Sequence, residues 1–294
     1  MINPLKYILN KHIYNLGSYE TKFLKLHDGI IEYYSFGKGP PLFLVMGYAA
    51  TMNAWDFRLL AELAKFYQVI LFNNRNTGNS IFKTDDYTLT DLADDIEKLR
   101  INLKLDKINL LGISMGGIIA QKYANGYPGN LSNLILINTL PPGNLSEHPS
   151  YQVENALRNL SEGNLKSYLR LFYLIFSKPW YWLSLWVFHF KPHGSKNIVS
   201  KETIRKQQEI LEEWNKLLDP EKFLNKITTN TLIFVGGKDR IVPPINSKIL
   251  KKCITNSKLV NFSNGGHLLI YEYPKLARVI INSLILNFSK LDTN

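Results

Sequence analysis

A serine between two glycines is the first feature that could do chemistry, in the run Gly112-Ile113-Ser114-Met115-Gly116. An apolar run precedes it and a helix-like run follows it, so the serine lies on a predicted strand-to-helix turn. The turn must be tight, because a side chain at either glycine would crowd the strand or the helix. Such a turn presents its serine at the carboxyl edge of a sheet, where ligands bind in open α/β folds. Ser114 is therefore the candidate nucleophile.

A serine hydroxyl needs a general base, and the positions of the six histidines favour one of them. His12 lies ahead of the predicted strands, His27 adjoins a predicted hairpin turn, and three more fall in a segment without predicted strands. His267 instead follows the last predicted strand, in the run Asn264-Gly265-Gly266-His267. We expect it at the same sheet edge as the serine, where it would act as the base.

A carboxylate is expected as a third member, because it orients the imidazole and stabilises its charged form. Asp239 follows the predicted strand 231–235 in the run Gly236-Gly237-Lys238-Asp239-Arg240. Each residue alone could be an ordinary turn residue. The order serine, aspartate, histidine, with each residue after a strand, predicts a catalytic triad.

Attack on a carbonyl also needs hydrogen-bond donors for the developing oxyanion. One candidate is the backbone N–H of Met115, at the start of the predicted helix. The second should come from the loop after the predicted strand 42–46, and we predict the backbone N–H of Tyr48. The Tyr48 side chain would then face the site as a wall or as a hydrogen-bond donor.

The elements that must position these residues alternate along the first half of the chain. Apolar runs predict buried parallel strands at residues 42–46, 69–72, 108–112 and 134–137. Helical patterns lie between them at 55–66, 90–103 and 115–127, the second with Thr90 as its predicted N-cap. This alternation predicts a doubly wound, mostly parallel α/β sheet.

The alternation stops after residue 138 and resumes near residue 231. Further strands are predicted at 231–235 and 259–262, and helices at 244–252 and 274–288. The segment between the two parts is predicted to be mostly helical. We therefore expect one sheet domain in two parts, residues 1–139 and 227–294, interrupted by a helical insertion at residues 140–226.

Together these motifs resemble the α/β-hydrolase superfamily, of the type with a helical cap after the sixth strand. The resemblance covers residues 23–140 and 231–288, including the loops of Asp239 and His267. It also covers a loop similar to the family's Asp-x-Arg-Gly-x-Gly-x-Ser, here Phe72-Asn73-Asn74-Arg75-Asn76-Thr77-Gly78-Asn79-Ser80. Two positions depart from the family pattern. Met46 stands where a histidine is usual, and Asn76 replaces a glycine, although asparagine also tolerates a left-handed backbone.

The resemblance implies a serine hydrolase that transfers an acyl group to water. A serine nucleophile argues against haloalkane dehalogenases and epoxide hydrolases, which use aspartate. Carboxylesterases, thioesterases, lipases, lactonases, carbon–carbon bond hydrolases and perhydrolases remain. Their chemistry requires neither a metal nor an organic cofactor. The alternative from another class is a ligand-binding protein that retains the triad but turns over little.

Residues 171–190 are unusually aromatic and bear on the substrate. Twenty residues could cross a bilayer, but Lys178-Pro179 divides the stretch into halves too short to cross, so no stable membrane insertion is expected. The alternatives are a lid at a lipid surface, as in a lysophospholipase or monoacylglycerol lipase, and simple packing onto the sheet. We predict an apolar acyl pocket lined by Phe172, Phe176, Trp182 and Trp186.

Positive charge is concentrated in the same segment. The chain carries a formal net charge of +11, and the window from Lys166 to Lys206 holds eight basic residues and one acid. Such a surface steers acidic partners, among them acyl carrier protein, coenzyme A thioesters and anionic lipids. The specific hypothesis is a methyl ester of an acyl chain on acyl carrier protein, as in the family's esterases of biotin synthesis. The alternative is a lysine-rich composition of the kind that AT-rich genomes produce.

Several function classes are disfavoured by composition. Cys253 is the single cysteine, which excludes an intramolecular disulfide and a cysteine-based zinc cluster. Nucleic acid is not an expected partner, because no recognised binding module accompanies the basic window. Polar residues interrupt residues 1–16, and no signal-peptide core or cleavage site is evident. We therefore expect a cytoplasmic protein.

Overall fold

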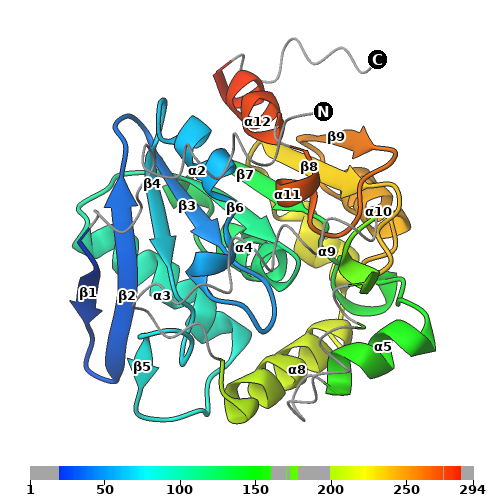
Figure 1. Ribbon diagram of the computed structural model, residues 1–294, viewed down its shortest axis with the longest axis horizontal. Helices are drawn as coiled ribbons and strands as arrows, with labels where there is room; N and C mark the ends of the chain where they lie inside the picture. The colour runs from blue at the N-terminus through cyan, green and yellow to red at the C-terminus, as the bar shows by residue number, and fades with distance from the viewer. Residues whose placement is uncertain (1–19, 160–169, 171–172, 178–198, 274, 286–294) are drawn as a thin grey trace, which may run out of the picture.

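The computed structural model describes residues 20–159, 170, 173–177, 199–273 and 275–285, which build one sheet with helices on both faces (Figure 1). Across the described part of the sheet the order is β1-β2-β4-β3-β6-β7-β8-β9, with β5 paired to β2. The strands are β1 (Lys22–Lys25), β2 (Gly29–Phe36), β3 (Pro41–Val45), β4 (Gln68–Phe72), β5 (Ile81–Phe82), β6 (Ile108–Ile113), β7 (Leu131–Ile137), β8 (Thr231–Gly236) and β9 (Ser257–Phe262).

Strands β3, β4 and β6 to β9 pair in parallel with one another, which confirms the doubly wound, mostly parallel sheet. All six predicted strands are present. Every residue of β6 and β8 is buried, as expected where helices cover both faces of a parallel sheet. The antiparallel strands β1, β2 and β5 were not predicted, because polar residues such as Glu32 and Ser35 interrupt the apolar run of β2.

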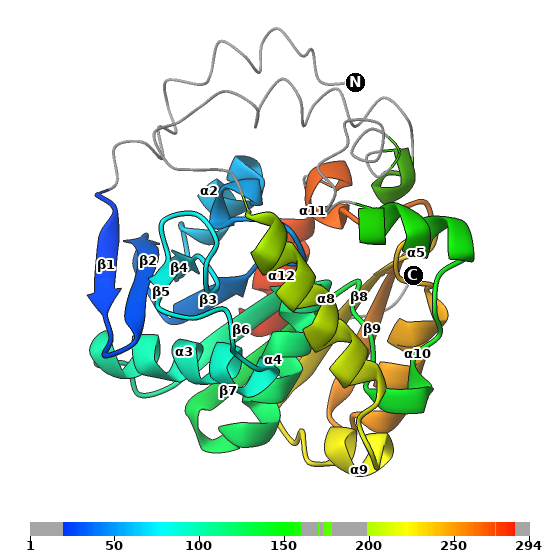
Figure 2. The ribbon, with the colours of Figure 1, turned by 90° about the horizontal axis from the view of Figure 1, so that it is seen from below.

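The helices divide the core into two layers. Leu59 of α2 and Ile280 of α12 pack in the layer on one face of the sheet. Ile96 of α3, Ile119 of α4 and Leu250 of α10 pack in the layer on the other, and Figure 2 shows α3 and α4 side by side there. The helices are α2 (Phe57–Leu63), α3 (Leu89–Asn102), α4 (Met115–Gly126), α5 (Tyr151–Arg158), α8 (Lys201–Asn215), α9 (Pro220–Asn225), α10 (Ile245–Cys253), α11 (Leu269–Glu272) and α12 (Leu276–Ile285).

The N-cap of α3 differs from the prediction. Thr88, and not Thr90, caps the helix, because Thr88 forms a reciprocal capping box with Asp91. The Thr88 hydroxyl accepts the N–H of Asp91 at 3.3 Å, and the Asp91 carboxylate accepts the N–H of Thr88 at 2.8 Å. Two orphan donors at the helix start are satisfied in this way, which a cap at Thr90 could not achieve.

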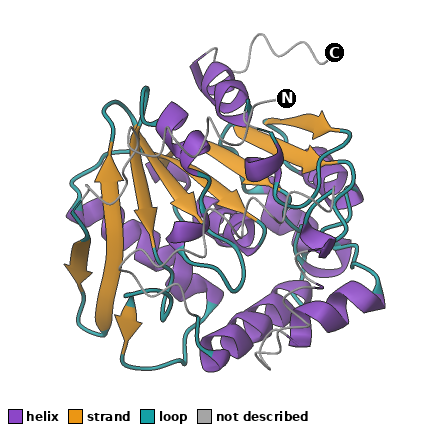
Figure 3. Cartoon of the chain, viewed as in Figure 1, coloured by secondary structure: helices purple, strands orange, loops and turns teal. Residues whose placement is uncertain are grey.

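The described residues between β7 and β8 include α5, α8, α9 and a short 3₁₀ turn at Gly143–Leu145 (Figure 3). This segment follows β7, which is the sixth strand if the two-residue β5 is set aside. Helix α8 bonds to loops that follow three strands. The Thr203 hydroxyl donates to Asn76 O at 3.1 Å, and the Trp214 indole donates to Pro141 O at 2.9 Å. Gln207 accepts the N–H of Ala49 at 2.8 Å.

No helix in the described ranges combines the length and the apolar character needed to cross a membrane. Of the aromatic stretch 171–190, the structure describes only residues 173–177.

Replacement of Gly116 by alanine should destabilise the fold, because the new Cβ would lie 2.1 Å from Val45 O. Overpacking of this kind costs about 1–3 kcal/mol, and here the neighbouring atom is backbone, which cannot swing aside. Gly126 lies at the other end of the same helix with no atom within 4 Å of a built Cβ, so Gly126→Ala is the matched control. Urea unfolding should show a loss for the first variant and none for the second. Equal stabilities would contradict the close approach of α4 to β3.

Candidate active site

Ser114 occupies the turn between β6 and α4 with a strained backbone. Its φ is 54° and its ψ is −125°, a combination that non-glycine residues rarely adopt. Its N–H donates to Ile137 O at 3.0 Å, and its carbonyl accepts the Thr139 hydroxyl at 2.7 Å. Ile137 ends β7 and Thr139 follows it closely, so the neighbouring strand and the residues after it hold the turn.

Close packing around Ser114 requires glycine at several positions. A Cβ on Gly112 would lie 2.2 Å from Gly116 O, and a Cβ on Gly117 would lie 2.5 Å from the Thr139 side chain. A Cβ on Gly47 would lie 3.1 Å from the Cβ of Ser114. The loop after β3 therefore borders the serine side chain directly.

Asp239 and His267 form a buried pair. The distance from His267 Nδ1 to Asp239 Oδ2 is 2.8 Å, and the side chains are 7% and 0% exposed, respectively. Asp239 Oδ1 accepts the N–H groups of Ile241 at 2.8 Å and Val242 at 2.9 Å. An ionised carboxylate only accepts hydrogen bonds, so the ring proton lies on Nδ1. Nε2 is then the ring nitrogen that can take up a proton.

Asn138 joins the strand ends to the histidine loop, a role that was not predicted from the sequence. It follows β7 with φ of 46° and is almost fully buried. Its amide nitrogen donates to Gly266 O at 3.0 Å and to His267 O at 2.6 Å, and its amide oxygen accepts the N–H of Gly236 at 2.8 Å. The only sequence signal was an asparagine directly after a buried strand.

The two residues predicted to supply oxyanion donors line one cavity with Ser114. Met115 is the first residue of α4, where helix geometry leaves the N–H without an intrahelical partner. Tyr48 lies in the loop after β3, and its hydroxyl donates to Leu157 O of α5 at 3.4 Å. The next residue, Ala49, has φ of 54° and donates its N–H to the buried Gln207. Helix α8 therefore fixes the loop that carries Tyr48.

The loop similar to the family's Asp-x-Arg-Gly-x-Gly-x-Ser supports the same region. Asn76 has φ of 54°, which confirms the left-handed backbone expected where the family has glycine. Asn73 accepts the N–H of Met52 at 2.8 Å, and the Asn74 amide donates to Met46 O at 3.4 Å. Arg75 is bound by two hydrogen bonds, of 2.6 and 2.8 Å, to Asp95. The bonds of Asn73 and Asn74 tie the loop after β4 to the chain on either side of Tyr48, and those of Arg75 tie it to α3.

The cavity beside Ser114 measures about 170 Å³. Two charged residues of α5, Glu154 and Arg158, and Glu212 of α8 also line it. The apolar lining was not predicted from the sequence, although several of its residues follow the predicted motifs closely in the chain. That lining includes Ile118, Leu140, Leu157, Leu211, Ile241 and Val242.

Of the four predicted aromatic pocket residues, the structure describes only Phe176, which does not line this cavity. Phe176 is fully buried in the core and packs edge-on against Tyr271, with ring centroids 6.3 Å apart. It is absent from the residues around the Ser114 cavity. Phe172, Trp182 and Trp186 lie outside the described residues.

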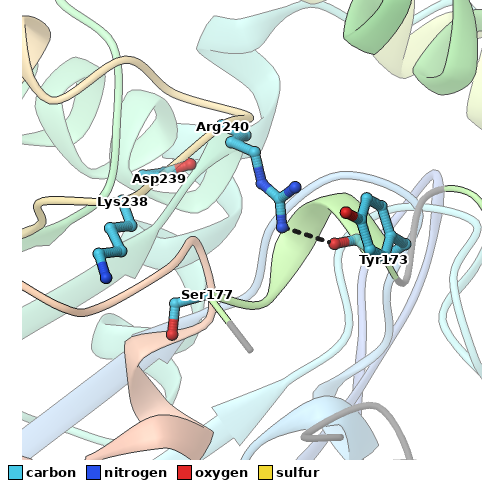
Figure 4. Close-up of a pocket in the computed structure, with 5 residues that line it drawn as sticks. All are labelled: Tyr173, Ser177, Lys238, Asp239 and Arg240. Carbon is cyan, nitrogen blue, oxygen red and sulfur yellow. Dashed lines mark hydrogen bonds between the residues drawn. The ribbon is translucent and has the colours of Figure 1, made fainter. Parts of the chain in front are cut away.

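A second cavity, of about 420 Å³, is lined by Tyr173, Ser177, Lys238, Asp239 and Arg240 (Figure 4). Arg240 stacks over the Tyr173 ring at 4.8 Å and donates to the carbonyls of Tyr173 and Phe176, both at 2.8 Å. The loop of Asp239 is thereby bonded to residues 173–177 of the insertion.

Comparison with known proteins matches residues 40–274 to the family described as "alpha/beta hydrolase fold". A protein named proline iminopeptidase PfmaB, from Pestalotiopsis fici, is 32% identical over 228 residues, which cover 72% of this chain and 79% of that protein. AB hydrolase superfamily protein YisY, from Bacillus subtilis, is 28% identical and covers 86% of this chain and 92% of its own length. The solved esterase from Exiguobacterium antarcticum superposes with a TM-score of 0.74 at 26% identity, over 90% of this chain and 100% of its own.

Replacing Ser114 by glycine should relieve its backbone strain, and the free energy of unfolding should show this. We expect Ser114→Gly to be more stable than Ser114→Ala by about 1 kcal/mol, because glycine removes strain of about 1–3 kcal/mol but loses more entropy on folding. Ser247 lies in α10 with a helical backbone, so there the order should reverse, with Ser247→Gly the less stable. Urea unfolding of the four variants measures both differences. The same order at both sites would refute the strain at Ser114.

Proposed function

The chain belongs to the α/β-hydrolase family and is a hydrolase, and we propose that it cleaves carboxylic esters or thioesters through Ser114, His267 and Asp239. The observation that carries the proposal is the buried 2.8 Å contact between His267 and Asp239. The strained turn of Ser114 and an apolar cavity beside it support the same assignment.

In the proposed reaction, Ser114 Oγ attacks the carbonyl carbon and its proton passes to His267 Nε2. The N–H groups of Met115 and Tyr48 stabilise the oxyanion. His267 then returns the proton to the leaving alkoxide or thiolate, and an acyl-enzyme remains. Water attacks this ester by the same route and releases the acid. Asp239 holds the ring and stabilises the imidazolium at each stage.

The described cavity has room for a small acyl group, or for the carbonyl end of a longer chain. About 170 Å³ is below the roughly 300–1,000 Å³ of pockets that enclose larger ligands. Aliphatic side chains from α4, α5, α8 and the loops after β7 and β8 line it, so the favoured acyl group is apolar. A longer chain would have to extend beyond the described lining.

A series of p-nitrophenyl esters tests the reaction and the cavity together. We expect wild-type turnover to be fastest with acetate to butyrate and to fall for decanoate and longer chains. Ser114→Ala should lower kcat by about 10³-fold or more, since it removes the nucleophile. A fluorophosphonate should label wild type at Ser114 and leave the variant unlabelled. Labelling elsewhere, or equal turnover by the two proteins, would refute the role of Ser114.

A finer proposal is that the ester is carried by an acidic acyl carrier protein, as a methyl ester of its acyl chain. Lys201 and Arg205 are exposed on α8, and Leu211 and Glu212 of the same helix line the cavity. Lys206 is less available, since it pairs with Glu209 at 3.3 Å and Asp86 at 3.8 Å. The carrier would lie along α8, outside the cavity, and such a partner would place the enzyme in the cytoplasm. Lys166, Lys178, Lys191 and Lys196 lie outside the described residues.

Charge reversal tests the carrier directly. The double variant Lys201→Glu and Arg205→Glu should lower kcat/KM for a carrier-bound ester about tenfold at low salt and leave p-nitrophenyl butyrate unchanged. The loss should disappear at high salt, because exposed charges are screened. Lys251→Glu with Lys252→Glu on α10 makes the same change in net charge and is the control. Equal losses for both pairs, or for both substrates, would exclude docking at α8.

Measurements on the wild-type protein also discriminate the two alternative functions, a lipid-surface enzyme and a ligand-binding protein with little turnover. A lipid-surface enzyme should partition onto anionic vesicles and hydrolyse lysophospholipid faster when it is bound. A ligand-binding protein should be labelled at Ser114 yet release its acyl group far more slowly than it is acylated. Steady turnover of small esters without binding to vesicles would exclude both.

A further inference from the structure

Glu272 is a buried carboxylate at the end of α11, five residues after His267. Its side chain reaches two segments of the chain. Oε2 accepts the N–H of Gly266 at 2.6 Å and the Ser177 hydroxyl at 3.1 Å, and Oε1 accepts the N–H of Ser177 at 2.6 Å. Glu272 thus bridges the peptide next to His267 and Ser177 of the insertion.

The bonding pattern fits the ionised form of Glu272. Burial raises the pKa of this carboxyl group, and the nearby charge of Asp239 adds to the rise, while the bonds from Gly266 and Ser177 oppose it. Backbone N–H groups can only donate, so a proton on either oxygen would face a donor. Loss of the charge would therefore weaken the bridge to one segment or both.

Residues 173–177 also bond directly to the backbone of the histidine loop. Ile175 O accepts the N–H of His267 at 2.9 Å and of Leu268 at 3.3 Å. The approach is close, because a Cβ on Gly266 would lie 2.5 Å from the N of Ser177. Arg240 binds the same segment from the loop of Asp239 (Figure 4). This short part of the insertion therefore contacts both loops of the buried acid–histidine pair.

We propose that Glu272 is a positioning residue for His267, which fastens the Gly266–His267 peptide to Ser177 of the insertion. The imidazole then keeps its place for proton transfer only while residues 173–177 are docked. This inference rests on the proposed hydrolase function. Glu272 itself touches neither the substrate nor the reacting atoms.

The first test is Glu272→Gln, which keeps the size of the side chain but turns an amide NH₂ toward one of the two backbone donors. We expect kcat for p-nitrophenyl butyrate to fall about ten- to a hundredfold, as for a misplaced catalytic group, with KM nearly unchanged. Glu97→Gln is the matched control. Glu97 is also a buried carboxylate, with bonds from Arg100, Tyr123 and Asn130, but it lies on α3. Its variant should lose stability and keep kcat.

Two further variants separate positioning from general stability. Ser177→Ala removes the 3.1 Å bond but retains both backbone bonds, so its kcat should stay within about twofold of wild type. Glu272→Asp keeps the charge but shortens the reach, and its kcat should lie between those of wild type and Glu272→Gln. If the glutamine variant does not fold, the aspartate variant is compared with Ser177→Ala and Glu97→Gln in its place. Equal kcat in all variants, or losses that follow melting temperature alone, would overturn the proposal.

A proton NMR signal tests the positioning role of Glu272 independently of whether the protein hydrolyses esters. The Nδ1–H proton of His267, bonded to Asp239, should give a downfield proton NMR resonance that is assigned by its absence from His267→Ala. Glu272→Gln should shift or broaden it, and Glu97→Gln should not. If the wild-type protein neither hydrolyses esters nor is labelled by the fluorophosphonate, the proposed function is refuted. The effect of Glu272→Gln on the resonance would still test the positioning role of Glu272. An unchanged resonance in Glu272→Gln would overturn the positioning role.

Discussion

The strained backbone of Ser114 is the constraint on which the rest of the site depends. A serine at φ of 54° and ψ of −125° is stable only where its surroundings leave no alternative. They do so because α4 passes close to β3 and to the end of β7, so close that Gly116 and Gly117 have no room for a Cβ. That approach in turn requires a fully buried β6 between parallel neighbours. Sheet, helix and turn therefore form one unit.

Three buried polar side chains then bind the surrounding loops to this unit. Asn138 holds the strand ends and the histidine loop, Gln207 holds the loop of Tyr48, and Glu272 bridges Gly266 and Ser177. Each is bonded to backbone groups of another segment. An unpaired buried polar group costs about 1–3 kcal/mol, so each of these side chains specifies the position of its loop as well as stabilising it.

The insertion between β7 and β8 serves two purposes in this arrangement. Its helices α5 and α8 supply part of the lining of the Ser114 cavity, including Leu157 and Leu211. Residues 173–177 and α8 also make the bonds that position the loops of the core. The residues proposed for catalysis lie on loops of the sheet, while helices of the insertion line the cavity beside Ser114. The insertion therefore couples the lining of the cavity to the positions of the loops of the core, because it contacts both.

The sequence by itself determined the parallel strands, the turn of Ser114 and the order of Ser114, Asp239 and His267. These features are local: an apolar run, a glycine or a turn residue fixes each of them within a few positions. It could not assign Phe176, since an aromatic residue at helical spacing fits a pocket and a core equally well. Nor could it find Asn138, Gln207 or Glu272, which have partners 129, 158 and 95 residues away in the chain, respectively. Only the tertiary structure brings such groups together, because a buried amide or carboxylate takes its partner from whatever backbone the fold places beside it.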